Sequence, residues 1–155
     1  MRRLDREITD LNKIQDIIKN NQCCRLGFID QDKVYIVPLN YGYLYENNKH
    51  IFYFHGAKEG KKIDLIKQNN QVGFEIDNNH QLVEGKTPCQ YSMKYQSIIG
   101  HGSIELVEEN EEKKLGLQLI MKNIASKDVT FNDRMVSSVS VIKLIVENLS
   151  CKANQ

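Results

Sequence analysis

Short segments rich in β-branched and aromatic residues restrict the folds open to this chain more than any other feature. Such segments are typical of strands, and they cover residues 23–29, 34–45, 49–55, 71–76, 82–83, 95–107 and 137–147. Polar clusters at Asp30–Asp32 and Asn78–His80 predict turns between consecutive strands. Strands joined by short turns pair antiparallel, so the pattern favours an antiparallel sheet that closes into a barrel.

Two of the predicted strands contain residues that disturb regular pairing. Pro38 lies within 34–45 and has no backbone N–H, so this strand is expected to bulge or to lie at a sheet edge. Gly100 and Gly102 lie within 95–107 and predict a sharp bend, as barrel strands require.

Three segments show helical spacing of apolar residues instead. They are a helix that Asp10 caps, a short helix over Lys61–Gln68 and a longer helix over Asn110–Ala125. Their expected apolar faces contain Leu11, Ile14, Ile17 and Ile18, then Ile63 and Ile66, then Leu117, Ile120 and Ile124. The helix at 61–68 is too short to suggest a doubly wound fold, so we expect an α+β chain, mainly β, with peripheral helices.

Length and charge limit the functional classes. The 155 residues suit one domain, 1–155, with a single core. A net charge of +1 gives no global attraction to nucleic acid or to an anionic membrane. No apolar stretch approaches the roughly 18 residues that span a bilayer, and no apolar region typical of a signal peptide follows the charged N-terminus. We therefore expect a cytoplasmic protein without a nucleic-acid or membrane partner.

The cysteines support the same compartment. Their positions, 23, 24, 89 and 151, give no CxxC pair. Cysteines in strand-like apolar surroundings are usually small core residues. The sequence therefore predicts reduced thiols and no structural metal.

The start of the helix at 61–68 carries an unusual charge pattern. Helix N-termini normally attract acidic residues, yet Lys58, Lys61 and Lys62 gather here with only partial acidic offset. A bound phosphate would explain the pattern, because free N–H groups and ammonium groups would bind the same anion, and Gly56 and Gly60 would let the backbone approach it. The alternative is a solvated loop whose lysines extend into water. The spacing is neither that of a P-loop nor that of a Rossmann motif.

His55 ends the strand before this loop. The period of two places it on the face of Ile51 and Tyr53, opposite Phe52 and Phe54. A histidine at a strand end can be a hydrogen-bonded structural residue. Beside a cofactor phosphate it can also exchange protons with a bound ring.

Several motifs occur in the order of a known family. They are Cys24–Phe28, Tyr35–Tyr43, Phe54–Ala57 followed by Gly60–Lys62, Phe74–Asp77, and Tyr95–Gly102. From about Arg3 to Lys152 the chain resembles the 5-nitroimidazole resistance (Nim-like) branch of the pyridoxamine 5′-phosphate oxidase-related flavoproteins. The resemblance implies a split β-barrel that binds FMN and forms a homodimer with FMN at the subunit interface.

The resemblance also implies a set of FMN-binding residues. The isoalloxazine ring would lie along Val37, Pro38, Leu39 and Asn40. The ring and ribityl chain would be bordered by Phe54, His55, Gly56 and Ala57, the phosphate would be held by Lys61 and Lys62, and the pocket would be completed by Ser97. His55 matches a histidine implicated in redox chemistry, so it is the candidate catalytic residue.

The chain departs from the family at its C-terminal end. Vitamin B6 oxidases carry basic and aromatic residues there that hold the substrate phosphate. Residues 147–152 have no clear equivalent, and Arg134 is the only arginine in the last part of the chain. We therefore do not expect pyridoxamine phosphate oxidase activity.

Three functions remain open. The leading hypothesis is a flavoenzyme in which FMN passes electrons from a nicotinamide or protein donor to a small organic acceptor such as a nitroaromatic. The second is a non-catalytic module that holds FMN or another anionic ligand such as haem, with His55, His80 or His101 as candidate axial ligands. The third is a structural dimer with an empty site. Drug resistance in a host would be a further step beyond FMN binding.

Overall fold

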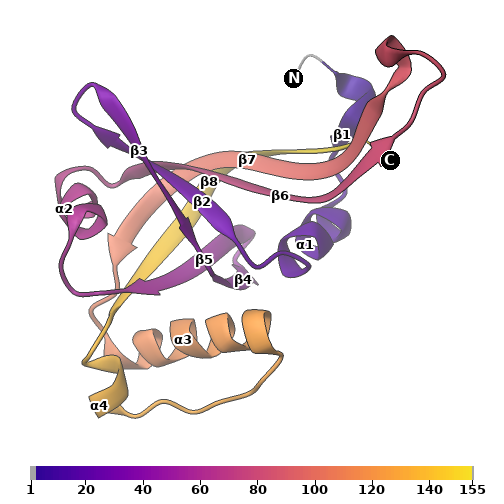
Figure 1. Cartoon of the computed structure of the whole chain (residues 1–155). Helices are drawn as coiled ribbons and strands as arrows, with labels where there is room; N and C mark the ends of the chain where they lie inside the picture. The colour runs from indigo at the N-terminus through magenta and orange to yellow at the C-terminus, as the bar shows by residue number, and fades with distance from the viewer. Residues whose placement is uncertain (1–2, 155) are drawn as a thin grey trace.

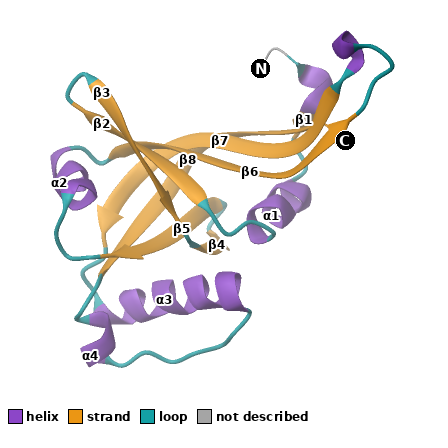
Figure 2. Ribbon diagram, viewed as in Figure 1, coloured by secondary structure: helices purple, strands orange, loops and turns teal. Residues whose placement is uncertain are grey.

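Antiparallel strands are the largest component of the structure, a computed structural model that describes residues 3–154. The strands are β1 (Glu7–Ile8), β2 (Cys24–Asp30), β3 (Lys33–Leu39), β4 (Gly42–Glu46), β5 (Lys49–Gly56), β6 (Gln71–Val83), β7 (Ser92–Leu106) and β8 (Ser140–Asn154). The helices are α1 (Leu11–Lys19), α2 (Lys61–Gln68), α3 (Asn110–Ala125) and α4 (Asp133–Val136), with 3-10 turns at Leu4–Arg6 and Pro88–Gln90. The predicted α+β class, mainly β with peripheral helices, is confirmed (Figure 2).

One sheet contains all of the strands, in the order β3-β2-β6-β7-β8-β5-β4, with β1 added to β8. Every pairing is antiparallel. The sheet curves round so that β3 crosses in front of β5 (Figure 1), but within residues 3–154 no backbone pairing joins the two ends of the sheet. The barrel is therefore open between β3 and the β4–β5 side.

Two apolar clusters lie on opposite faces of this sheet. The inner cluster contains Leu26, Phe28, Phe52, Phe54 and Phe74 and is closed by α1 and α2. The outer cluster lies between α3 and the β4–β5–β8 part of the sheet and contains Ile51, Tyr53, Val107, Leu117, Ile120, Val136 and Val141. Side chains alternate along β5, so this strand contributes to both clusters: Phe52 and Phe54 point inward and Tyr53 points outward.

Helices α2 and α3 have the predicted bounds, and α1 begins directly after Asp10 as predicted. Asp10 accepts a hydrogen bond from the Lys13 N–H at 2.9 Å and so caps α1 as predicted. In α3, Leu117 and Ile120 are buried and Ile124 is partly buried. None of the helices within residues 3–154 has both the length and the apolar character needed to cross a bilayer.

The strands differ from the prediction in three main ways. The segment 34–45 divides at Asn40–Tyr41 into β3 and β4. The predicted turn at Asn78–His80 is wrong, because β6 continues through it as a β-bulge with Asn79 at φ 56°. The last strand begins at Ser140, after the short helix α4, and continues to Asn154 rather than ending at Glu147.

The interrupting residues behave as predicted. Pro38 lies opposite Arg25 on β3, a strand at the edge of the sheet, where a residue without an N–H is tolerated. The pairing of β7 with β8 shifts register between His101 and Gly102. A Cβ at Gly102 would lie 2.1 Å from the Ile145 carbonyl oxygen, so this shift needs a residue without a side chain.

Candidate functional site

The segment that joins β5 to α2 forms an anion cradle, defined here as Gly56, Gly60, the first amides of α2 and the Lys62 ammonium. Gly60 is the N-cap of α2 and adopts φ 121°, a conformation that favours glycine. Its carbonyl oxygen accepts from Ile63 N at 2.8 Å, but no side chain caps the helix. The amides of Lys61 and Lys62 are therefore available to a ligand.

Lys62 completes the cradle. Its ammonium lies against the end of β5, since a Cβ at Gly56 would be only 2.7 Å from Lys62 Nζ. Lys62 is half-buried, and it takes part in no ion pair within residues 3–154. The cradle therefore combines a cation beside the end of β5 with the uncapped, positive end of the α2 dipole.

Lys61 points elsewhere. Its ammonium pairs with the Asp30 carboxylate at 2.5 Å and lies 5.0 Å from the centre of the Tyr35 ring. These contacts tie the start of α2 to the β2–β3 hairpin. The structure thus separates the two lysines that the sequence grouped at a phosphate.

The open side of the barrel exposes two strand edges beside the cradle. β4 pairs with β5 only as far as Tyr53, so the stretch Phe54–Gly56 has β8 on one side and no partner strand on the other. β3 pairs with β2 alone. The backbone groups on these two free edges have no partner strand and are available to hydrogen-bond a ligand.

The side chains of the predicted site residues take different positions. Phe54 is fully buried and points inward, whereas His55 and Ala57 are exposed. On β3, Val37 and Leu39 pack partly against the core and Pro38 is exposed. Asn40 is exposed and its amide donates to the Gln22 carbonyl oxygen at 2.7 Å.

Ser97 is far from this cradle within one chain. On β8, Val141 lies opposite His55 and Lys152 lies opposite Ser97. The two predicted site residues are therefore eleven residues apart along β8. At about 3.3 Å per residue this is about 36 Å along the strand. A surface hollow of about 540 Å³ lies near Ser97 instead, lined by Asn79, His80, Gln81, Lys94, Tyr95, Gln96 and Asn154.

Comparison with known proteins identifies the family. The family model for pyridoxamine 5′-phosphate oxidase matches residues 10–153, which is most of the chain. The chain belongs to the pyridoxamine 5′-phosphate oxidase family. The predicted resemblance is confirmed, and with it the split-barrel fold.

One of the solved structures similar to this family member is more than 30% identical to it. It is a protein from Bacteroides thetaiotaomicron VPI-5482 named for 5-nitroimidazole antibiotic resistance, with 32% identity, 96% of this chain and 90% of that chain covered, and a TM-score of 0.80. A flavocytochrome, Anf3 from Azotobacter vinelandii, has a TM-score of 0.82 at 14% identity over 100% and 72% of the chains. An FAD and haem binding protein from Mycobacterium smegmatis has a TM-score of 0.81 at 11% identity over 97% and 74%. At these lower identities the likeness shows the fold alone. No curated protein matches the chain.

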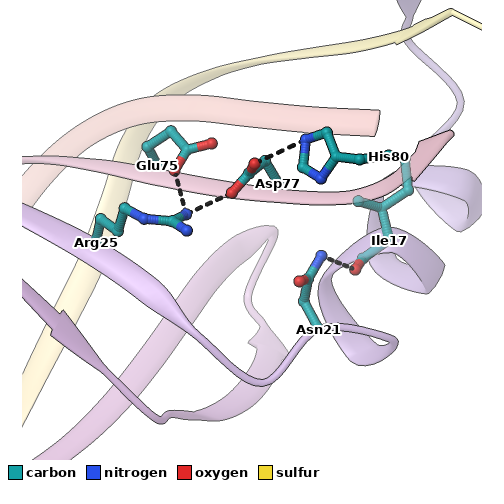
Figure 3. A network of polar contacts seen from close by, with 6 residues as sticks. All are labelled: Ile17, Asn21, Arg25, Glu75, Asp77 and His80. Atoms are coloured by element: carbon teal, nitrogen blue, oxygen red, sulfur yellow. Dashed lines mark hydrogen bonds and ion pairs between the residues drawn. The ribbon is translucent and has the colours of Figure 1, made fainter. Parts of the chain in front are cut away.

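This member of the family also has a polar network that the sequence reasoning missed. Arg25 on β2 donates to Glu75 at 2.8 Å and also to Asp77, and the Asp77 carboxylate pairs with His80 at 2.9 Å (Figure 3). Burial raises the pKa of Glu75 and the hydrogen bond from Arg25 opposes that rise. The sequence signal for this network is the spacing of Glu75 and Asp77, because residues two apart lie on the same face of a strand.

The described residues contain no recognisable metal centre. Within residues 3–154 no group of three or more His, Cys, Asp or Glu side chains is arranged to hold a metal ion. All four cysteines are free, with Cys24 and Cys151 buried and Cys89 exposed.

Proposed function

We propose that this chain is an FMN-binding flavoprotein that passes electrons to a small organic acceptor such as a nitroaromatic. The observation that carries the proposal is the anion cradle, which combines an uncapped glycine-led helix start with the Lys62 ammonium at the end of β5. A terminal phosphate fits this chemistry because it would accept hydrogen bonds from the free amides and a charge-assisted bond from Lys62.

The edge of β3 suits the other end of the same cofactor. Tyr35 lies beside Lys61, and the strand from Tyr35 to Leu39 runs about 13 Å further along the open side of the barrel. Backbone groups of Val37–Asn40 would bind the polar edge of the ring, and Phe54, Gly56 and Ala57 would border the ribityl chain. Bound FMN would supply reversible hydride and electron transfer, while the protein fixes its position.

His55 is the residue proposed to act at the ring. It is exposed at the end of β5, beside the cradle and next to the unpaired strand edge. There it would hold or deliver a proton to the acceptor. Electrons would enter from a reduced nicotinamide or from a protein donor.

The proposal includes a cytoplasmic homodimer with FMN at the subunit interface. Its support is the family, together with the separation of Ser97 from the cradle within one chain. Two copies would allow Ser97 of one to complete the pocket of the other.

An absorbance spectrum of the purified protein, with mass identification of the bound molecule, tests the proposal. We expect flavin bands and the mass of FMN. The variant K61A/K62A is expected to lose them, and stoichiometric FMN in that variant would contradict the phosphate assignment. Nitroimidazole sensitivity of a host with and without the gene tests drug resistance separately.

A second candidate is a non-catalytic flavin or haem module. It is favoured by two structural neighbours, a flavocytochrome and an FAD and haem binding protein. His55, His80 and His101 are all exposed and would be the candidate axial ligands. A Soret band in the purified protein, or flavin that no donor reduces, would favour this candidate.

A further inference from the structure

The outer edge of β4 is a free strand edge at the end of the sheet, because β4 pairs with β5 alone. The turn between these strands has two residues, Asn47–Asn48, both with positive φ. Residues that flank such a turn, here Glu46 and Lys49, exchange hydrogen bonds, and bonded pairs then alternate along the hairpin. The N–H and C=O groups of Tyr43 and Tyr45 therefore point away from β5.

This free edge is closed only where β4 begins. The Tyr41 carbonyl oxygen accepts from the Asn123 side chain of α3 at 3.0 Å, and the same amide group also donates to the Asn21 carbonyl oxygen. Within residues 3–154 no backbone hydrogen bond from another element reaches Tyr43 or Tyr45. Their N–H and C=O groups are thus available to an added strand.

A groove with basic walls leads to the free edge. It is a hollow of about 390 Å³, lined by Lys19 of α1, Tyr43 of β4, and Leu119, Lys122, Asn123 and Ser126 of α3. The lining contains no acidic side chain, and neither lysine has an ion-pair partner within residues 3–154. The groove therefore carries two uncompensated cations.

The two cations approach the edge from opposite faces of the sheet. α1, with Lys19, closes the inner cluster, whereas α3, with Lys122, covers the outer cluster (Figure 1). A Cβ at Gly42 would lie 2.5 Å from the backbone nitrogen of Ile120, so α3 lies directly against the start of β4. This close packing fixes the outer wall of the groove before any partner binds.

The positions of the lysines define the chemistry of a segment that would fit the groove. A strand added to β4 would lie about 4.8 Å from it, and its successive side chains would point alternately toward α1 and toward α3. One residue would then face Lys19 and an adjacent residue would face Lys122. Two neighbouring acidic side chains would neutralise both cations, whereas basic side chains would be repelled.

We propose that the free edge of β4, between α1 and α3, binds an extended acidic segment of a partner protein by strand addition. Backbone hydrogen bonds to Tyr43 and Tyr45 would supply affinity, and the two lysines would select acidic residues. The site is separate from the proposed flavin site. Tyr45 lies opposite His50, and His50 is six positions, or about 20 Å, from Gly56 along β5.

A phage library of random nine-residue peptides, selected on the immobilised protein, tests the proposal. We expect the enriched peptides to share two adjacent acidic residues within a stretch of β-branched or aromatic residues. The most enriched peptide is then labelled with fluorescein and titrated with the protein by fluorescence anisotropy. A library that yields no binder, or binders without the acidic pair, would overturn the proposal.

Charge reversal tests the role of the two lysines. The double variant Lys19→Glu/Lys122→Glu should bind the selected peptide at least tenfold more weakly, with an unchanged far-UV spectrum because both side chains are exposed. Replacing the two acids of the peptide with lysines should restore binding to this variant. Lys67→Glu is the matched control, since Lys67 is an exposed lysine on α2, and it should change the affinity little. Equal affinity of the double variant and the wild type would contradict the site.

Methylation of the peptide backbone tests strand addition. A methyl group is placed on the backbone nitrogen of one acidic residue or of the other, and only one of these N–H groups can face β4. One methylated peptide should therefore lose at least tenfold in affinity while the other binds like the parent. Equal effects of the two methyl groups would rule out strand addition. So would an acetylated dipeptide amide of two glutamates that binds as tightly as the whole peptide, because it would show a site for small acids.

Discussion

At the scale of single residues, the two lysines at the start of α2 have different environments. Lys62 lies over Gly56 in the cradle, while Lys61 pairs with Asp30 and stacks near Tyr35. We expect Lys62→Ala to weaken flavin binding at least tenfold, as the loss of one charge-assisted hydrogen bond predicts. Lys61→Ala should weaken it less. Flavin titration followed by absorbance measures both, and a greater loss in Lys61→Ala would contradict the assignment.

Glycines of this sheet should respond in opposite ways to a methyl group. Gly102→Ala forces a Cβ against the Ile145 carbonyl oxygen, so we expect a loss of about 2 kcal/mol or more in the free energy of unfolding. Gly73→Ala makes only ordinary van der Waals contacts, the nearest at 3.9 Å, so it should be neutral or should stabilise the monomer by up to about 1 kcal/mol. Urea denaturation gives both values, and equal losses would show that close approach does not explain Gly102.

At the scale of elements, a small polar network fixes α3 to the sheet. The Lys143 ammonium donates to Glu112 at 2.7 Å, and the Tyr53 hydroxyl donates to the same carboxylate oxygen at 2.9 Å. The hydrogen bond from Lys143 lowers the pKa of Glu112 below its ordinary value of 4.5. Because the folded state prefers the charged form, this contribution to stability is complete above about pH 4.5 and is lost as the pH falls through the lower folded pKa.

Glu112→Gln should therefore cost about 1–2 kcal/mol in unfolding free energy near pH 7. The difference from the wild type should shrink as the pH falls into the acid range below about 4.5. Urea denaturation across this range measures it. Glu111→Gln is the control, because Glu111 is 86% exposed and its pair with Lys114 should contribute little. A difference that is constant with pH would contradict the role of the Glu112 charge.

Elements were predictable to different degrees, for physical reasons. Helices α2 and α3 follow from apolar spacing, and their predicted bounds match the structure. The bulge at Asn78–Gln81 was missed because asparagines favour turns and bulges by the same left-handed conformation. The split at Asn40–Tyr41 was missed because both halves have strand composition.

The candidate site was predictable only in part. The charge pattern at the start of α2 indicated an anion site, and the geometry around Lys62 agrees with it. Which lysine points into the cradle depends on Asp30 and Tyr35, which lie about 30 residues earlier in the chain. Side-chain direction across such a separation is not encoded in local spacing. The FMN assignment itself came from the family resemblance and stays a prediction.

At the scale of the whole molecule, the two apolar clusters share their strands. Phe52 and Tyr53 are neighbours on β5 yet belong to opposite clusters, and Val141 and Ile142 do the same on β8. If the strands that support one cluster unfold, the other cluster therefore loses its support as well. We expect one cooperative unfolding transition for the entire chain, as a single domain requires.

Leu26→Ala in the inner cluster and Leu117→Ala in the outer cluster test this expectation. Each should lower the free energy of unfolding by about 2–4 kcal/mol and move the same single transition. Far-UV dichroism and tyrosine fluorescence should give coincident curves at one fixed protein concentration, because association would add to stability. Separate transitions for the two probes would show that the clusters unfold independently.

The connection between the extended ends of β6 and β7 carries a thiol that reagents can reach. The exposed thiol of Cys89 lies in the connection at their tip, while burial raises the pKa of Cys151 to about 11 and raises that of Cys24 still further. Alkylating reagents and spin labels react with the thiolate, so at mild pH they should modify Cys89 well before the two buried thiols. If two copies associate as proposed, a label there would report the distance between their β6–β7 tips.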